Sequence, residues 1–216
     1  MLSESLTDET LSRALRFLAD RDLDLAQILG SLGPPPMWAR EPGFPTLVLV
    51  ILEQQVSLAS ARAAYDRLLA AASPLTPEKS LELDDVRLKA IGFSRQKTAY
   101  GRYLARAILD GRLDLGALDG MDDAAARSAL TQIKGIGPWS ADIYLLMALR
   151  RPDIWPSSDL AVAVAVQRIK GLASRPTPDE LDARGENWRP WRAVAARLLW
   201  HYYLSRPKLS LDRASI

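Results

Sequence analysis

The sequence predicts an all-α protein, because apolar residues recur at helical spacing and clusters of proline and glycine separate the periodic segments. The spacing is clearest in two segments, at Leu11, Leu15 and Leu18 and at Leu58, Ala61, Tyr65 and Leu68. The breaks fall at residues 33–36, 41–43, 73–74, 152, 156 and 176–178. With 216 residues, of which 48% are hydrophobic, the chain can form one domain or two closely packed lobes with an apolar core.

The most informative segment is IKGIGPWSAD at residues 133–142, which predicts a tight turn between two helices. Residues 124–133 favour a helix, and Pro138 suits the first position of the next helix because its φ is already helical. Gly135 and Gly137 allow a positive φ and the close approach of another backbone. Exposed N–H groups at a helix start bind a phosphate at any base sequence. The alternative is a Schellman-type helix stop in an ordinary helical hairpin.

The run from residue 130 to residue 149 resembles the helix-hairpin-helix segment of the DNA base-excision glycosylases. Within this segment, GIGPWSA at 135–141 is similar to the hairpin of the glycosylases that remove alkylated bases, the DNA-3-methyladenine glycosylase II type. Four further segments resemble motifs of this family in the same order: ILEQQVS at 51–57, IGFSRQKTAY at 91–100, WPSSDL at 155–160, and WRPWR at 188–192 with Leu199 and Trp200. The resemblance spans roughly residues 44–204.

The resemblance implies two helical lobes with an active-site cleft between them. A central lobe of residues 46–150 would carry the helix-hairpin-helix at about 124–149, and residues 1–45 with 151–216 would form a second lobe from both termini. The resemblance also makes LAVAVAV at 160–166 a buried helix, although its period-two alternation is typical of a strand.

Composition excludes several kinds of site. Without cysteine the chain can form neither a disulfide nor a thiolate metal site, including the iron–sulfur cluster of some helix-hairpin-helix glycosylases. The single histidine, His201, excludes a zinc site built from a histidine cluster. We therefore expect no required cofactor and no metal, although the resemblance allows a monovalent cation on the hairpin carbonyls.

The sequence also predicts a cytoplasmic monomer. It begins without a charged and apolar leader, and its longest apolar runs, at 47–52 and 160–166, are too short to cross a bilayer. No membrane partner is expected.

The net charge of +2 is too small to predict a DNA-binding surface by itself, but basic residues are unevenly distributed. Residues 86–106 contain no acid and six basic residues: Arg87, Lys89, Arg95, Lys97, Arg102 and Arg106. Residues 187–208 also lack acids and contain Arg189, Arg192, Arg197, Arg206 and Lys208. These segments favour one positive face. The alternative is a pair of ordinary solvated helix faces.

The resemblance assigns catalysis to Asp159. Ser158 is a good N-cap for a helix opening at Asp159, which would place the carboxylate in the first turn, where the helix dipole favours its ionised form. A base alkylated at a ring nitrogen is already cationic, so it leaves without a strong acid. A carboxylate then stabilises the charge that develops on the sugar and orients the attacking water. The alternative is an ordinary helix-start aspartate.

Trp139 stands where family members with lyase activity carry a Schiff-base lysine, so the resemblance implies a monofunctional enzyme. Trp139 and Trp200 would line the base pocket, where electron-rich rings attract a cationic base. For Trp200 the alternative is core packing. Ile143 and Leu160 occupy places where some relatives have an aromatic residue, which predicts a less aromatic pocket.

The resemblance places DNA contacts at two further points. Gln54 and Gln55 match the wedge that fills the gap left by the flipped base, and Gln55 corresponds to the inserting residue. The alternative is a polar surface pair. Gly135, Ile136 and Gly137 would contact the DNA backbone.

These observations predict a monofunctional DNA glycosylase of base excision repair. It would hydrolyse the N-glycosidic bond of alkylated purines, such as 3-methyladenine, in double-stranded DNA after base flipping. The alternatives are a non-catalytic helix-hairpin-helix DNA-binding module and a glycosylase for another damaged base.

Overall fold

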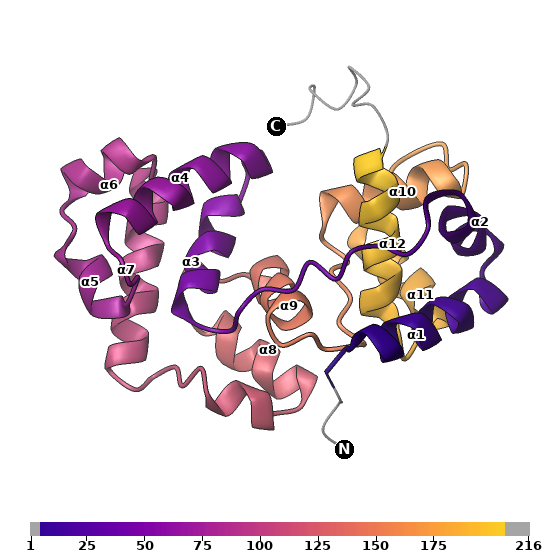
Figure 1. Ribbon diagram of the computed structural model, residues 1–216, viewed down its shortest axis with the longest axis horizontal. Helices are drawn as coiled ribbons and strands as arrows, with labels where there is room; N and C mark the ends of the chain where they lie inside the picture. The colour runs from indigo at the N-terminus through magenta and orange to yellow at the C-terminus, as the bar shows by residue number, and fades with distance from the viewer. Residues whose placement is uncertain (1–4, 206–216) are drawn as a thin grey trace. The chain divides into compact units, whose positions relative to one another are not determined.

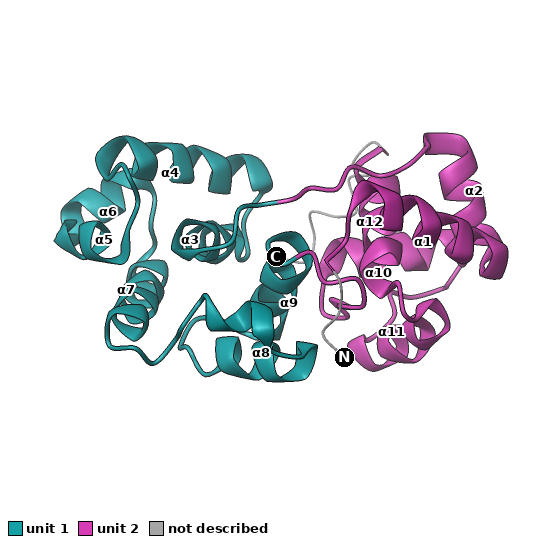
Figure 2. Ribbon diagram, turned by 60° about the horizontal axis from the view of Figure 1, so that its bottom comes forward, with its two compact units in different colours: residues 1–2, 40–149 teal, residues 3–39, 150–216 magenta. Residues whose placement is uncertain are grey.

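The computed structural model describes residues 5–205, and within this range it contains helices but no strand. The prediction of an all-α protein is therefore confirmed. The chain divides into two compact units, which Figure 2 shows in different colours. Residues 40–149 form unit 1, and residues 5–39 with 150–205 belong to unit 2.

Unit 1 is built around one apolar helix, α3. Its helices are α3 (Phe44–Glu53), α4 (Leu58–Ala71), α5 (Pro77–Glu82), α6 (Asp85–Ile91), α7 (Arg95–Leu109), the short η1 (Ala117–Gly120), α8 (Asp123–Thr131) and α9 (Pro138–Met147) (Figure 1). Several begin after a side chain that accepts a backbone N–H of the first turn: Ser57, Thr76, Asp84, Ser94 and Asp122. Helix α3 contacts α4, α7 and α9, and seven of its ten residues are buried. A helix that is apolar on all sides belongs in a core.

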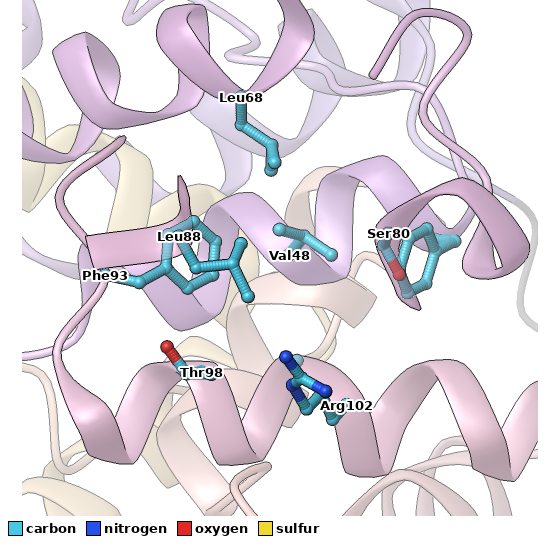
Figure 3. A pocket seen from close by; sticks show the side chains of 9 residues that line it. Val48, Leu68, Ser80, Leu88, Phe93, Thr98 and Arg102 are labelled. Atoms are coloured by element: carbon cyan, nitrogen blue, oxygen red, sulfur yellow. The ribbon is translucent and has the colours of Figure 1, made fainter. Parts of the chain in front are cut away.

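A small cavity of about 20 Å³ lies among these helices (Figure 3). Its lining includes Val48, Leu68, Ser80, Leu88, Phe93, Thr98 and Arg102. Pockets that bind small molecules measure roughly 300–1,000 Å³. This cavity is therefore a packing gap and is too small for a nucleobase.

Unit 2 combines helices from both ends of the chain. It contains α1 (Asp8–Arg21), α2 (Leu23–Leu32), α10 (Leu160–Ile169), α11 (Pro178–Gly185), the short η2 (Glu186–Trp188) and α12 (Arg192–Ser205) (Figure 1). Helix α12 contacts α10, α2 and α1, and its residues 193–200 are all buried. The core of this unit is therefore centred on α12.

The strand-like segment 160–166 is helical, as predicted. It forms most of α10, and residues 162–166 are buried in unit 2, whereas Leu160 at the start of the helix is 51% exposed. Because a buried helix is apolar on all sides, alternation of alanine and valine does not distinguish it from a strand.

Asp22 connects three parts of unit 2. Its carboxylate caps α2 by accepting the Asp24 and Leu25 amides, and it also accepts hydrogen bonds from Lys170 Nζ at 2.9 Å and Trp188 Nε1 at 3.0 Å. Burial opposes ionisation of Asp22, but the hydrogen bonds from Lys170 and Trp188 outweigh this effect, so its pKa is lowered.

Candidate functional site

The turn between α8 and α9 gives its two glycines different roles. Gly135 has a φ of +100°, and a Cβ at this position would collide with the Tyr100 ring. Gly137 has a φ of −84°, and a Cβ there would meet no other atom within 4 Å. The positive φ expected of such a turn therefore occurs at Gly135, whereas Gly137 leaves room for another backbone to approach.

The N-terminus of α9 has the properties of an anion-binding end. Pro138 is the first residue of α9, as predicted. The N-cap is Gly137, and no side chain accepts a capping hydrogen bond from the first turn of the helix. Both residues are exposed, whereas the Ile136 side chain is only 3% exposed. This end of α9 therefore presents backbone groups and the positive end of the helix dipole to its surroundings.

An ion pair between α8 and α9 holds the two helices of the hairpin together. Arg127 Nε donates to Asp142 Oδ1 at 2.6 Å, and the side chain of Asp142 is only 3% exposed. Because the carboxylate is buried, loss of the arginine would leave a buried charge without this partner.

The structure separates the two glutamines predicted to act as a wedge. Gln54 Nε2 donates to the Gly135 carbonyl oxygen at 2.8 Å and to Ser140 Oγ at 2.9 Å. Gln55 is exposed and has a left-handed backbone with a φ of +56°. The side chain of Gln54 is thus bonded to the hairpin, whereas Gln55 is the exposed residue of the two. The assignment of this pair to a wedge stays a prediction.

Asp159 lies at the start of α10, but in a different capping position from the predicted one. Asp159 itself is the N-cap, and its Oδ1 accepts the Val162 amide at 2.9 Å. Ser158 is exposed and does not cap the helix. The prediction placed the cap one residue too early, because serine and aspartate cap helices about equally well.

A second donor holds the same carboxylate oxygen. Trp200 Nε1, on α12, donates to Asp159 Oδ1 at 3.0 Å. Asp159 is 8% exposed and Trp200 is 7% exposed. The indole of Trp200 is thus packed in unit 2 and bonded to the predicted catalytic group. Its assignment to the base pocket stays a prediction.

Trp38 is an aromatic neighbour that the sequence analysis missed. Its ring contacts Trp200 edge-on, with centroids 6.3 Å apart and an interplanar angle of 76°. Trp38 is half-buried and has a φ of +48°, which is uncommon for a residue other than glycine. The only signal in the sequence is a tryptophan shortly after the prolines at 34–36, and it does not reveal the contact.

The comparison with known families decides the identity of the chain. Residues 48–190 match the family model described as HhH-GPD superfamily base excision DNA repair protein. The chain belongs to this superfamily. The match includes α9, Gln54 and Asp159, whereas Trp38 and Trp200 lie outside the matched residues.

Relatives of this HhH-GPD protein include YfjP of Bacillus subtilis, which is 34% identical over 124 residues, 57% of this chain and 43% of YfjP. DNA-3-methyladenine glycosylase 1 of Schizosaccharomyces pombe is 26% identical over 82% of this chain and 79% of its own length. Among solved structures, S. pombe 3-methyladenine DNA glycosylase (Mag1) in complex with abasic DNA superposes with a TM-score of 0.82 at 26% identity. The superposition covers 87% of this chain and 95% of Mag1.

In unit 1 of this HhH-GPD protein, part of the first basic segment is bonded to partners within the unit. In residues 86–106, Arg102 pairs with Asp85 at 2.6 Å, and Lys97 is half-buried and donates to the Leu52 carbonyl oxygen. Four residues of the segment are exposed: Arg87, Lys89, Arg95 and Arg106. The prediction that this segment contributes to a positive face therefore concerns these four residues.

The second basic segment is mostly used within unit 2, which corrects the prediction. Arg189 and Arg192 each pair with both Asp153 and Glu186. Arg197 is fully buried and donates to the Met37 and Ala193 carbonyl oxygens, and burial lowers its pKa to about 10. Arg206 and Lys208 lie outside the described residues.

The remaining predicted positions are placed as follows. Trp139 is half-buried in the first turn of α9, and Ile143 in the same helix is 3% exposed, so Ile143 belongs to the core.

Residues 5–205 contain no group of three or more histidine, aspartate or glutamate side chains that could hold a metal ion. In the same range no helix is long and apolar enough to cross a membrane.

Proposed function

We propose that the protein is a monofunctional DNA glycosylase that hydrolyses the N-glycosidic bond of alkylated purines, such as 3-methyladenine, in double-stranded DNA. The observation that carries the proposal is the carboxylate of Asp159, held at the start of α10 by the Val162 amide and the Trp200 indole. Membership of a base excision repair superfamily, and relatives named DNA-3-methyladenine glycosylase, support the substrate class.

The proposed chemistry suits a carboxylate that works without a partner acid. An alkylated base carries a positive charge and is a good leaving group, so charge develops mainly on the deoxyribose as the bond breaks. Asp159 would stabilise that charge and orient the attacking water. At about 4 Å and an effective dielectric constant near 20, the attraction is about 4 kcal/mol. Such an energy corresponds to roughly a thousandfold in rate.

Binding to DNA is assigned to the hairpin and to the loop after α3. The open space at Gly137 and the N-terminus of α9 would receive a backbone phosphate without reading any base. Gln55 would fill the stack after the damaged base is flipped, which partly offsets the cost of extracting that base. Its exposed position and left-handed backbone support this role.

The absence of a lysine at position 139 supports base release without strand cleavage. Trp139 occupies the first turn of α9 and cannot form an imine. Lys134 is exposed and lies over the Tyr103 ring, 5.0 Å from its centroid. We therefore assign Trp139 to the base pocket and expect an intact abasic site as the product.

Three finer assignments complete the proposal: a cytoplasmic location, a monomeric state, and a monovalent cation on the hairpin carbonyls. Two of these carbonyls already accept hydrogen bonds, Ile133 O from the Ile136 amide and Gly135 O from Gln54. A carbonyl oxygen has two lone pairs, so these bonds leave one on each oxygen for a cation.

The proposal is tested by incubating the full chain with duplexes that carry alkylated, deaminated or oxidised bases and measuring free base. Release of 3-methyladenine, with strand cleavage only after hot alkali and no adduct trapped by borohydride, is the expected result. Binding without release from any duplex would identify a non-catalytic DNA-binding module. Efficient trapping would show that an amine of the protein reaches the sugar.

A further inference from the structure

The carboxamide of Gln54 connects the end of α3 to both sides of the hairpin turn. Its two N–H donors are both used, one on the Gly135 carbonyl oxygen at 2.8 Å and one on Ser140 Oγ at 2.9 Å. Gly135 precedes the proposed phosphate contact at Gly137, and Ser140 follows it in the first turn of α9. One side chain therefore holds the backbone on either side of Gly137.

Two further interactions fix the same end of α3. Glu53 and Arg40 form a bidentate ion pair with distances of 2.7 and 2.8 Å, and the Glu53 side chain is 8% exposed. Lys97 Nζ donates to the Leu52 carbonyl oxygen at 2.7 Å, and burial lowers the pKa of Lys97. Three consecutive residues, 52–54, are thus held by partners elsewhere in unit 1.

The residue that follows them, Gln55, has an unusual backbone. A left-handed conformation in a residue other than glycine persists when the surrounding structure determines it. Here the surroundings are residues 52–54, whose last member is bonded directly to the hairpin. The orientation of Gln55 at the protein surface is therefore tied to the position of Gly137.

We propose that Gln54 is a positioning residue that fixes the wedge, Gln55, relative to the phosphate-binding turn at Gly137. Docking of a phosphate on the hairpin would then place Gln55 opposite one defined step of the duplex. This inference rests on the proposed function, because it assumes that both elements contact DNA. In this proposal Gln54 acts by positioning Gln55 and does not itself contact the base.

The chemistry of the contact explains why a glutamine is required. Both partners of Nε2 accept hydrogen bonds, so a carboxylate at position 54 would face the Gly135 carbonyl oxygen without a proton to donate. Methionine has a similar length and no N–H donor. Gln54→Met therefore removes the connection while keeping most of the packing.

A double-mutant cycle tests this role. Gln54→Met, Gln55→Ala and the double variant of the full chain would be compared by single-turnover release of 3-methyladenine and by fluorescence of 2-aminopurine placed beside the lesion. We expect each single variant to lose roughly ten- to a hundredfold in release rate, with less unstacking of the reporter. The double variant should be no slower than the slower single variant, because both changes remove the same step, the insertion of Gln55 into the duplex.

Affinity for an undamaged duplex and thermal melting distinguish positioning from general support. Gln54→Met should lower the melting temperature by only about a few degrees, since two hydrogen bonds are lost. It should leave the affinity nearly unchanged, since the Arg127–Asp142 ion pair still holds α8 against α9. Gln27→Met is the control for the substitution itself, because Gln27 is exposed in α2 of unit 2, away from the elements assigned to DNA binding. If Gln54→Met folds poorly, Ser140→Ala removes one of the two contacts and should reduce unstacking in the same direction.

Two results would overturn the inference. Multiplicative losses in the double variant would mean that Gln54 acts independently of Gln55. A parallel fall in affinity for undamaged DNA would mean that Gln54 only supports the hairpin. Failure of the proposed function is recognised separately, because the unmodified protein would then release no base, while the fluorescence cycle still measures the coupling between the two glutamines.

Discussion

At Asp159, a single carboxylate oxygen accepts both the Val162 amide and the Trp200 indole N–H. The first bond fixes the carboxylate at the positive end of α10, and the second connects it to α12. Trp38 packs edge-on against the same indole. The orientation of Asp159 therefore depends on residues from three distant parts of the sequence, all within unit 2.

We expect Trp200→Phe to slow base release by about tenfold, because a hydrogen bond to a charged group contributes about 1.5 kcal/mol and the phenyl ring cannot donate one. The ring contact with Trp38 would largely remain. Single-turnover release of 3-methyladenine at saturating enzyme measures the effect. A rate equal to that of the parent would show that the indole N–H does not orient the carboxylate during the reaction.

At the scale of elements, the start of α9 shows how two glycines in one turn serve different purposes. Gly135 is needed for the fold, because of its positive φ and the Tyr100 ring, whereas nothing in unit 1 requires a glycine at 137. Unused space next to an uncapped helix N-terminus is consistent with binding of a ligand backbone there.

Gly137→Val should weaken binding to all duplexes alike, since the added side chain obstructs a phosphate without touching a base. Gly135→Ala is the matched comparison and should instead lower the melting temperature, because alanine is strained at this φ. Affinity for several unrelated undamaged duplexes and thermal melting measure the two effects. Full affinity in a folded Gly137→Val variant would exclude phosphate docking at this turn.

Asp22 makes the packing of α2 sensitive to acid. Its pKa in the folded protein lies below the ordinary value of 3.8. The ionised group therefore contributes stability that is complete above that ordinary pKa and is lost as the pH falls through the folded one. Asp22→Asn should thus be less stable than the parent at pH 6, and the difference should shrink below about pH 4. Urea unfolding over this pH range tests the prediction, and a difference that did not change with pH would contradict it.

At the scale of the whole molecule, the sequence predicted helices and motifs better than it predicted contacts. The helix start at Pro138 and the helix over 160–166 were predicted, because proline position and family motifs are local signals. The capping residue of α10 was wrong by one position, since Ser158 and Asp159 compete for the same role.

The positive charge that a segment exposes at the surface could not be predicted by counting its basic residues. Arg192 lies in a run without acids, yet it pairs with Asp153, and Arg197 in the same run is buried. The partners of Gln54 are 81 and 86 residues away along the chain. Such pairings depend on the packing of distant helices, which periodicity and local motifs do not report.

We propose that base release depends above all on the carboxylate charge of Asp159. Asp159→Asn tests it most directly, because asparagine also caps a helix and its oxygen can accept the Trp200 indole N–H. The measurement is single-turnover release of 3-methyladenine, with affinity for the same duplex determined in parallel. We predict a loss of about three decades in rate at nearly unchanged affinity. A rate within about tenfold of the parent would show that the charge of Asp159 does not drive base release.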